Sequence, residues 1–462
     1  MRLFNTYVPN SVVALILSDL ALLFSSYIAA AYLVSEIDPS IWLLYEDGLG
    51  QIGFMVGGML LGLYYQDLYA DLRVRSRIYL FQQFSLVIGV GFIVQALFSY
   101  LAPQWALPTM VMTVGSGLLL VGLPAWRLVY SGVVIRAMGA QRVLFLGTSA
   151  EVRRIARRLN DRPELGLAVI GFCDDLAEED EPPPVGRMLG GLISFRRVVE
   201  EQKPDIIVVG MSERRQRMPV YELLDLRFSG IRVEQAATMY ERALGRVCLR
   251  ETRPSELVFS KELGPRPGIV RFQTIYSFLF AMVGIVITLP LMLAVALLVK
   301  LTSPGPVLYR QRRVGLNERQ FVLYKFRSMR ADAEAATGAV WASPDDPRTT
   351  GLGRWLRKLR LDELPQLLNV LKGEMLIVGP RPERPEFVAA LTEKIPFYRQ
   401  RLCLKPGITG WAQINHKYGD TLEDTMTKLE YDLYYIKNVA FALDAYIIFH
   451  TLKVMLLSRG AQ

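Results

Sequence analysis

Two adjacent carboxylates, Asp362 and Glu363, stand in the segment "RLDELPQLLNVLKGEMLIVGPRPE" with many cations nearby. One interpretation is structural, since aspartate is a favoured N-cap residue and Pro365 suits the first turn of a helix. The other is chemical. A helix dipole and neighbouring guanidinium groups keep a carboxylate ionised, and an ionised, oriented aspartate can attack phosphorus. The neighbouring cations are Arg354, Arg357, Lys358, Arg360, Lys372, Arg381 and Arg384.

These cations suit a phosphorylated substrate, because arginine binds phosphate oxygens in pairs and lysine acts as a point charge. A divalent cation that bridges a carboxylate and a diphosphate would reduce the repulsion between the two anions. The chain has only two histidines and three widely spaced cysteines, so neither a zinc site nor a disulfide framework is indicated. The expected cofactor is therefore Mg²⁺, with Mn²⁺ as the alternative, held by carboxylate and phosphate oxygens.

The elements that must position these residues include membrane segments. Of the 462 residues 52% are hydrophobic, and the formal net charge is +9, which together indicate a membrane protein with large basic soluble parts. Four apolar stretches, at 8–34, 49–65, 78–100 and 107–130, are long enough to cross a bilayer core of about 30 Å. Arginines after the second and fourth stretches place both ends of this bundle in the cytoplasm. They are Arg73, Arg75, Arg77, Arg127, Arg136 and Arg142.

The middle of the chain alternates strands and helices. A strand, a glycine turn and a helix are indicated at 142–159, and "AVIGFCDD", "KPDIIVVG" and "GIRVEQ" are typical of later strands. This order predicts a parallel, Rossmann-like sheet. A dinucleotide-binding turn has three spaced glycines, but Gly147 is followed by Ser149 and Val152 at the other two positions. We therefore expect a structural or oligomerising module here in preference to a nucleotide-binding one.

A further apolar run at 275–299 is long enough to cross the membrane, but two features favour a segment that enters the cytoplasmic leaflet and returns. Pro290 lies inside the run and would break or kink a helix. Basic residues flank both sides, and all of them can lie near anionic head groups if the segment returns. The alternative is a kinked fifth span. The flanking residues are Arg266, Arg271, Lys300, Arg310, Arg312 and Arg313.

Residues from about 268 to 462 resemble the monotopic phosphoglycosyl transferases, the bacterial sugar transferase family that begins exopolysaccharide, capsule and O-antigen synthesis. The motifs that carry the resemblance are "YRQRRVG", "YKFRSM", "LDELPQLLNVLKGEMLIVGPRP", "KPGITGWAQIN" and "YDLYYIKN", in the family's order and spacing. The upstream segments resemble the long form of that family. The resemblance implies a four-helix transmembrane bundle at 1–135, a degenerate Rossmann-like cytoplasmic domain at 136–262, and a mixed α/β monotopic catalytic domain with a re-entrant membrane helix at 263–462.

The family's reaction moves a sugar 1-phosphate from a UDP-sugar to undecaprenyl phosphate, releases UMP and requires Mg²⁺. Carried over by motif, Asp362 would be the nucleophile and a ligand of the metal, and Glu363 its partner in metal or proton handling. Pro290 would mark the break of the re-entrant helix. In the family a serine precedes this proline, but here the preceding residue is Leu289. Thr288, one residue earlier, would then be the hydroxyl that donates to the carbonyls freed by the proline. The resemblance also implies that Lys325, Arg357 and Arg381 contact phosphate or orient the carboxylate pair. Further substrate or phosphate contacts are implied for Arg327, Lys405, Thr409, Gln413 and Asp432.

Two alternatives stand beside this hypothesis. One is a non-catalytic membrane scaffold for polysaccharide assembly, against which the intact carboxylate pair argues. The other is direct displacement by the lipid phosphate, without a covalent intermediate. The expected setting is the bacterial inner membrane, with the catalytic domain on the cytoplasmic face, a homodimeric assembly and no nucleic acid partner. The sequence leaves the sugar open among glucose, galactose and N-acetylated sugars.

Overall fold

The computed structural model describes residues 2–3, 6–7, 10–34, 38–66, 68–69, 77–134, 140–175, 185–211, 218–249, 264, 266–330, 348–416 and 421–456. Two compact units divide the chain, Val8–Met239 and Tyr240–Gln462, and residues 2–7 belong with the second. The domain boundaries expected after residues 135 and 262 both lie outside the described residues.

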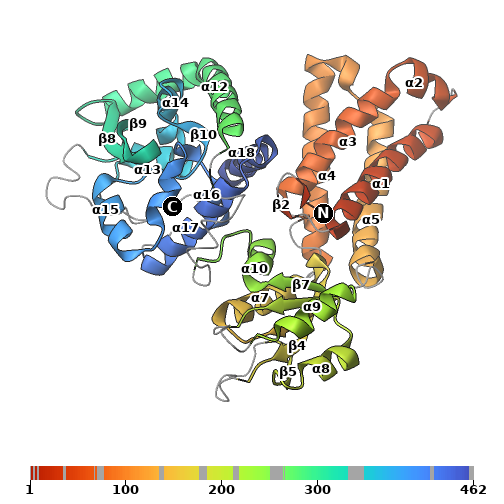
Figure 1. Cartoon of the computed structure of the whole chain (residues 1–462). Helices are drawn as coiled ribbons and strands as arrows, with labels where there is room; N and C mark the ends of the chain where they lie inside the picture. Colours follow the sequence, from red (N-terminus) through yellow and green to blue (C-terminus); the bar gives the residue numbers. More distant parts are fainter. Residues whose placement is uncertain are drawn as a thin grey trace. The chain divides into compact units, whose positions relative to one another are not determined.

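Apolar helices open the first unit, and they confirm the four predicted apolar stretches (Figure 1). The side chains of Leu23, Tyr27, Ile52, Phe84 and Leu119 are fully buried and form the centre of their common core. By length and hydropathy each long helix can cross a membrane. The elements are α1 (Asn10–Val34), α2 (Pro39–Tyr45), α3 (Gly48–Tyr65), α4 (Arg77–Leu101), η1 (Pro103–Trp105), α5 (Thr109–Val129) and η2 (Tyr130–Val134).

One arginine that was expected in a cytoplasmic loop is buried instead. Arg127 lies in the last turn of α5, and its guanidinium forms a 2.7 Å ion pair with Asp19 of α1. A second nitrogen of Arg127 donates to the Leu68 carbonyl at 2.7 Å, and the Tyr69 hydroxyl donates to Asp19 at 2.9 Å. Arg127 is therefore an internal cation and not a loop charge. Three of the other orienting arginines, Arg73, Arg75 and Arg136, lie outside the described residues.

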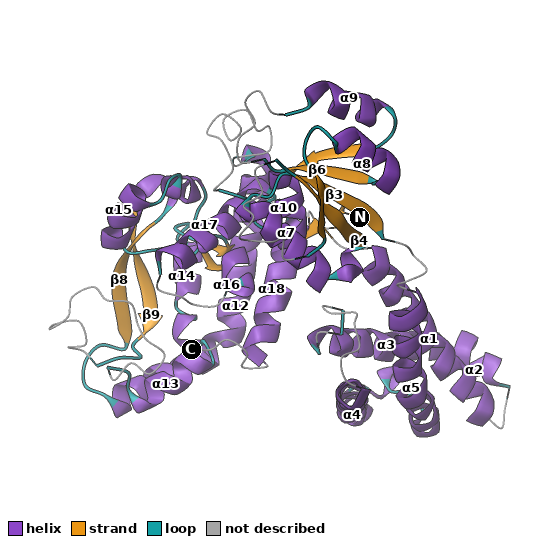
Figure 2. Ribbon diagram, turned by 90° about the horizontal axis from the view of Figure 1, so that it is seen from below, coloured by secondary structure: helices purple, strands orange, loops and turns teal. Residues whose placement is uncertain are grey.

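A five-stranded parallel sheet follows in the same unit, with the order β5-β4-β3-β6-β7 (Figure 2). The predicted parallel sheet is therefore confirmed. Its strands are β3 (Gln141–Leu146), β4 (Leu167–Cys173), β5 (Arg187–Gly190), β6 (Ile206–Val209) and β7 (Arg232–Gln235). The helices between and after them are α7 (Ala150–Asp161), η3 (Pro163–Leu165), α8 (Phe195–Gln202), α9 (Val220–Phe228) and α10 (Ala236–Leu244).

The turn after β3 shows what replaces the missing glycines. Gly147 has φ +105°, and a Cβ there would lie 2.5 Å from the Gly210 carbonyl oxygen, so glycine is required at this position. The Ser149 hydroxyl accepts a bond from the Val152 amide and caps α7. Thr148 donates from its amide and its hydroxyl to one Asp174 oxygen, at 2.9 and 2.8 Å. The turn is thus held by the Ser149 hydroxyl and by Asp174, which follows β4.

The second unit contains the motif-rich part of the chain. The first two of its motifs lie on an antiparallel hairpin, β8 (Leu308–Val314) with β9 (Gln320–Phe326), in which Tyr309 faces Lys325. A short parallel pair joins β10 (Leu376–Val378) to β11 (Gly407–Thr409). The other elements are α12 (Pro267–Thr302), η4 (Leu316–Glu318), α13 (Gly351–Lys358), η5 (Leu361–Glu363), α14 (Gln366–Leu371), α15 (Pro385–Lys394), η6 (Tyr398–Cys403), α16 (Trp411–Asn415), α17 (Leu422–Lys437) and α18 (Phe441–Leu456). Residues 2–7 form the strands β1 (Arg2–Leu3) and β2 (Thr6–Tyr7).

Helix α12 carries the apolar run and is continuous through Pro290. In Figure 1 its ribbon changes direction within the helix, so Pro290 lies in a bent helix and does not divide it into two. The Thr288 hydroxyl donates to the Gly284 carbonyl at 2.7 Å. The proline removes the usual donor for a different carbonyl, that of Val286 four residues earlier. Thr288 therefore does not replace the lost hydrogen bond, contrary to expectation.

Both ends of α12 are bonded to the rest of the second unit. Near its start, the Gln273 amide nitrogen donates to Asp444 at 2.8 Å and to the Tyr435 hydroxyl at 2.6 Å. Just past its end, Arg327 donates to the carbonyl and the hydroxyl of Ser303 at 2.8 and 2.7 Å. Residues 282–294, between these contacts, include no buried side chain. One apolar helix is thus held at both ends by the same compact unit.

The second unit also includes residues upstream of the expected boundary. Arg246 forms a 3.3 Å ion pair with Glu430 of α17, whose side chain is only 4% exposed. The Trp411 indole donates to the Gly245 carbonyl at 2.7 Å. Without Arg246 the buried Glu430 would lose its ion-pair partner, so residues 240–249 are part of the second unit in their contacts as well as in its bounds.

Candidate active site

The carboxylate pair lies on a short 3₁₀ turn, η5, between α13 and α14. Arg360, immediately before it, has φ 53°, in the left-handed region that residues other than glycine rarely adopt. Pro365 occupies the N-cap of α14, and no side chain caps that helix. The interpretation of Asp362 as an N-cap residue is therefore wrong. The predicted dipole contribution is also small, because α14 has only 6 residues.

Asn369 of α14 fixes this turn against the hairpin. Its side-chain oxygen accepts from the Tyr324 amide at 3.1 Å, and its nitrogen donates to the Val322 carbonyl at 2.7 Å. Both partners lie on β9, the strand that carries Lys325. This role could not be predicted from the sequence, since an asparagine inside an apolar helical segment gives no sign of a partner 45 residues away.

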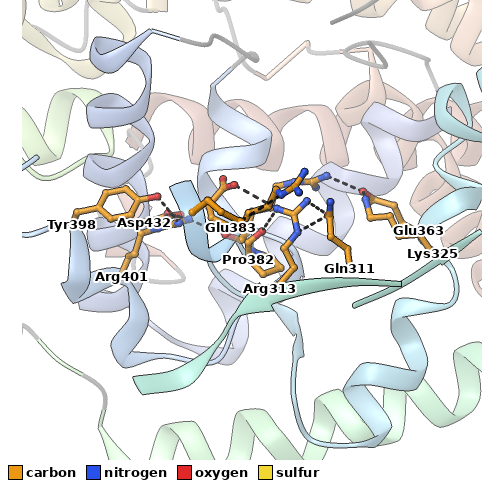
Figure 3. A network of polar contacts seen from close by, with 12 residues as sticks. Gln311, Arg313, Lys325, Glu363, Pro382, Glu383, Tyr398, Arg401 and Asp432 are labelled. Atoms are coloured by element: carbon orange, nitrogen blue, oxygen red, sulfur yellow. Dashed lines mark hydrogen bonds and ion pairs between the residues drawn. The ribbon is translucent and has the colours of Figure 1, made fainter. Parts of the chain in front are cut away.

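Glu363 is held by two of the predicted cations (Figure 3). Lys325 Nζ and Arg381 Nη2 each lie 2.9 Å from the same oxygen, Oε1. Burial alone would raise the pKa of the Glu363 carboxyl, but these two cations outweigh it and hold the pKa well below its usual range. Glu363 is therefore a fixed anion at neutral pH.

Asp362 has the opposite environment. Its side chain is buried, and no hydrogen bond or ion pair of its carboxylate is found among the described residues. Burial raises the pKa of Asp362 to about 6; the Lys325 cation opposes this rise and the Glu363 anion adds to it. The expectation that guanidinium groups hold Asp362 strongly ionised is not met, because the effect of burial on its pKa outweighs the Lys325, Arg357 and Arg381 cations. The carboxylate is still largely ionised above pH 7 and, lacking hydrogen bonds, is free to react.

Three other predicted phosphate ligands have different partners. Arg357 donates to the Thr349 hydroxyl at 3.2 Å, although its charge also lowers the pKa of Asp362. Arg327 is buried and bonds to the end of α12, as described above. Asp432 forms a buried 2.7 Å ion pair with Arg401. In this structure the side chains of Arg327 and Asp432 are therefore buried and bound to protein groups, and their contact with a substrate stays a prediction.

The loop at 405–413 is built onto the β10–β11 pair. Thr409 is buried and shares a 2.7 Å hydrogen bond with Thr451 of α18. Gln413 donates to the Ile408 carbonyl at 3.2 Å, and its side-chain oxygen is buried without a hydrogen-bond partner. Lys405 is half-buried. No hydrogen bond found in the described parts of the chain joins these predicted ligands to the carboxylate pair.

The residues present fit a magnesium ion bound together with a substrate. The described residues contain no group of three or more His, Cys, Asp or Glu side chains that could enclose a metal. Mg²⁺ is commonly held by one or two carboxylates plus substrate phosphates, and does not need a full protein cage. Asp362, with no hydrogen bond of its own, is the donor that suits this arrangement.

Comparison with known proteins gives consistent matches. The family described as "Bacterial sugar transferase" matches residues 270–458. The UDP-N-acetylgalactosamine-undecaprenyl-phosphate N-acetylgalactosaminephosphotransferase of Aeromonas hydrophila is 45% identical over 48% of this chain and 52% of its own length. The undecaprenyl-phosphate glucose phosphotransferase of Komagataeibacter xylinus is 34% identical over 70% of this chain and 60% of its own length. The UDP-glucose:undecaprenyl-phosphate glucose-1-phosphate transferase of Xanthomonas campestris pv. campestris is 34% identical over 71% and 70%. The chain therefore spans about half to three fifths of the first two relatives.

Proposed function

Because the chain belongs to the bacterial sugar transferase family, we propose that it transfers a sugar 1-phosphate from a UDP-sugar to undecaprenyl phosphate and releases UMP. The observation that carries this proposal is the contrast within the carboxylate pair. Glu363 is fixed by two cations, whereas the adjacent Asp362 forms no hydrogen bond in the described structure. An unbonded carboxylate beside a fixed cluster of charge suits a nucleophile for phosphoryl transfer and has no use in a scaffold.

The proposed reaction has two displacements at one phosphorus atom. A carboxylate oxygen of Asp362 attacks the phosphorus that carries the sugar, and the bond from that phosphorus to the bridging oxygen breaks. The bridging oxygen keeps the electron pair and leaves as part of UMP. An oxygen of undecaprenyl phosphate then attacks the same phosphorus, and the Asp362 carboxylate is released. Both displacements return Asp362 to its starting state.

The neighbouring residues provide charge rather than protons. The low pKa of Glu363 makes it a poor proton acceptor near pH 7, since a general base works best with a pKa near the operating pH. We therefore propose that Glu363 fixes Lys325 and Arg381, which stabilise the phosphates beside the nucleophile. Mg²⁺, bound by Asp362 and the substrate phosphates, would neutralise charge on the diphosphate.

A re-entrant α12 fits this reaction. Gln273 and Ser303 are 30 residues apart, which is about 45 Å along a straight helix and more than the bilayer core of about 30 Å. A spanning helix would place the two residues on opposite sides of the membrane, yet both are bonded to one compact unit. We propose that α12 enters and leaves on the cytoplasmic side, where Asp362 can reach both a nucleotide sugar and a lipid phosphate.

We assign the upstream parts supporting roles. The sheet order β5-β4-β3-β6-β7 is the doubly wound order of a Rossmann-like domain. Its first turn is closed by Ser149 and Thr148, which supports a structural or oligomerising role within the expected homodimer. The apolar helices would anchor this domain and the catalytic unit to the bacterial inner membrane.

Exchange of labelled UMP into a UDP-sugar, without lipid acceptor, tests the two-step reaction. An enzyme that forms a covalent phosphosugar catalyses this exchange, whereas direct displacement and a scaffold do not. UDP-glucose and UDP-N-acetylgalactosamine are the first donors to test, because the relatives are named for these sugars. If lipid-dependent transfer occurs without exchange, the covalent step is refuted. If neither occurs over a full donor panel, the proposed activity is refuted.

A further inference from the structure

Two arginines, the buried Arg401 and the half-buried Arg313, hold the backbone of the segment that carries Arg381 (Figure 3). Arg401 Nη2 donates to the Arg381 carbonyl at 2.9 Å. Arg313 Nη1 donates to the next carbonyl, that of Pro382, at 3.0 Å, and lies 3.6 Å from Glu383. Two consecutive peptide units are thus fixed from different elements, η6 and β8.

Arg401 is itself held firmly. Its Nε and Nη2 lie 2.9 and 2.7 Å from one oxygen of Asp432, and its Nη1 donates to the Tyr398 hydroxyl at 3.2 Å. The Arg401 and Asp432 side chains are only 6% and 3% exposed. The Asp432 anion is the charge partner that makes a buried guanidinium tolerable at this position.

The same residue, Arg381, joins this buried pair to the candidate active site. Its carbonyl accepts from Arg401, and its guanidinium donates to Glu363 at 2.9 Å. We propose that Arg401, held by Asp432, is a positioning residue that sets the place of Arg381 beside the carboxylate pair. This inference rests on the proposed function, and it gives Asp432 a role through Arg401 and Arg381 in place of the expected substrate contact.

Lysine cannot substitute for Arg401 in this role. A guanidinium presents donors in a fixed planar fork, so one side chain can bind Asp432, Tyr398 and the Arg381 carbonyl at the same time. An ammonium has its donors on a single atom and keeps only part of this set. In Arg401→Lys the charge pair survives, but the backbone of Arg381 loses its fixed donor.

The decisive experiment is a double-mutant cycle between Arg401→Lys and Arg381→Lys in the full-length chain, followed by UMP exchange. Because a displacement of about 1 Å can cost 10²-fold, Arg401→Lys should lower kcat by about 10- to 100-fold, with KM changed less than about twofold. In the Arg381→Lys background the same change should cost less than about threefold, because its effect passes through Arg381. Asp432→Asn should lower kcat in the same direction. The proposal would be overturned if the fold-losses in kcat of the two single variants multiply to give that of the double variant. It would also be overturned by an unchanged kcat in Arg401→Lys.

The pair of Arg246 and Glu430 is the matched control, since the half-buried Arg246 forms an ion pair with the buried Glu430 in the same unit, and no bond between this pair and Arg381 is found among the described residues. Arg246→Lys should lower the Tm but leave kcat unchanged.

The double-mutant cycle of positions 401 and 381 can also be measured by Tm. Because a Tm measurement needs no activity, it separates this inference from the proposed function. If the wild-type protein shows no transfer, the proposed function fails, and coupling in Tm between positions 401 and 381, absent between 246 and 381, still supports the positioning of Arg381 by Arg401. Equal coupling in the two cycles would overturn it.

Discussion

Asp362→Asn should abolish activity and at the same time stabilise the fold at neutral pH. Burial raises the pKa of Asp362 from 3.8 to about 6. A carboxyl group whose pKa is higher in the folded state stabilises the fold only while it is protonated. Its contribution is complete below the unfolded pKa and is lost as pH rises through about 6. Above that pH, the ionised Asp362 lowers the free energy of unfolding, and the neutral amide of asparagine does not.

The magnitude follows from the size of the pKa change. At 1.36 kcal/mol per pH unit, the change from 3.8 to about 6 corresponds to at most about 3 kcal/mol. At about 2–4 °C per kcal/mol for a unit of this size, the Tm of Asp362→Asn should exceed that of wild type by up to about 10 °C at pH 7.5. At pH 5 Asp362 is mostly protonated in the folded state but still ionised in the unfolded state, so about half of the difference should remain, and it should vanish only below about pH 3.8. No hydrogen bond is lost, because the described structure gives Asp362 none.

Thermal unfolding of detergent-solubilised protein at both pH values measures this effect, and UMP exchange measures the loss of activity. Glu363→Gln is the matched control, and its sign is opposite. Its carboxylate has a lowered pKa, so it stabilises the fold at neutral pH and its loss leaves Lys325 and Arg381 without their anion. An Asp362→Asn protein that is less stable than wild type at pH 7.5, or whose advantage is as large at pH 5 as at pH 7.5, would refute the assigned environment.

Three other predictions concern the start of the second unit, the turn before the carboxylate pair and helix α12. A fragment that begins at Tyr240 should show a higher Tm than one that begins at Gly264, because the shorter fragment leaves Glu430 without its ion-pair partner; equal Tm values would contradict this. Arg360→Gly should leave the Tm nearly unchanged, whereas Arg360→Val should lower the stability by about 1–3 kcal/mol, since a β-branched residue is strained at φ 53°. Ser303→Cys, in a chain without its three native cysteines, should resist a membrane-impermeant thiol reagent in intact cells, and labelling there would refute the re-entrant α12.

The sequence predicted the elements whose signals are local. Long apolar stretches predicted the helices around Tyr27, and alternating strands and helices predicted the parallel sheet, because hydropathy and periodicity depend on neighbouring residues. The resemblance to a family predicted that Lys325 and Arg381 act near the carboxylate pair, and in the structure both form ion pairs with Glu363.

What depends on burial and on distant partners could not be predicted. The cations near Asp362 in the sequence suggested a low pKa, but burial decides its direction, and burial is a property of the folded chain. Asp432 and Arg327 were assigned to the substrate because they lie in shared motifs. A motif does not distinguish a residue that touches substrate from one that holds the backbone, and only the folded chain brings Arg401 to Asp432.

The exposed middle of α12 has a consequence for the membrane itself. On the proposed topology, residues 282–294 add apolar volume to the cytoplasmic leaflet and none to the opposite leaflet. Such a one-sided wedge spreads the lipids of one monolayer and favours a surface that bulges towards the cytoplasm, as shallow insertions of amphipathic helices do. The protein would then sense lateral tension, and small vesicles with α12 inserted from outside would retain it better than flat bilayers of the same lipids.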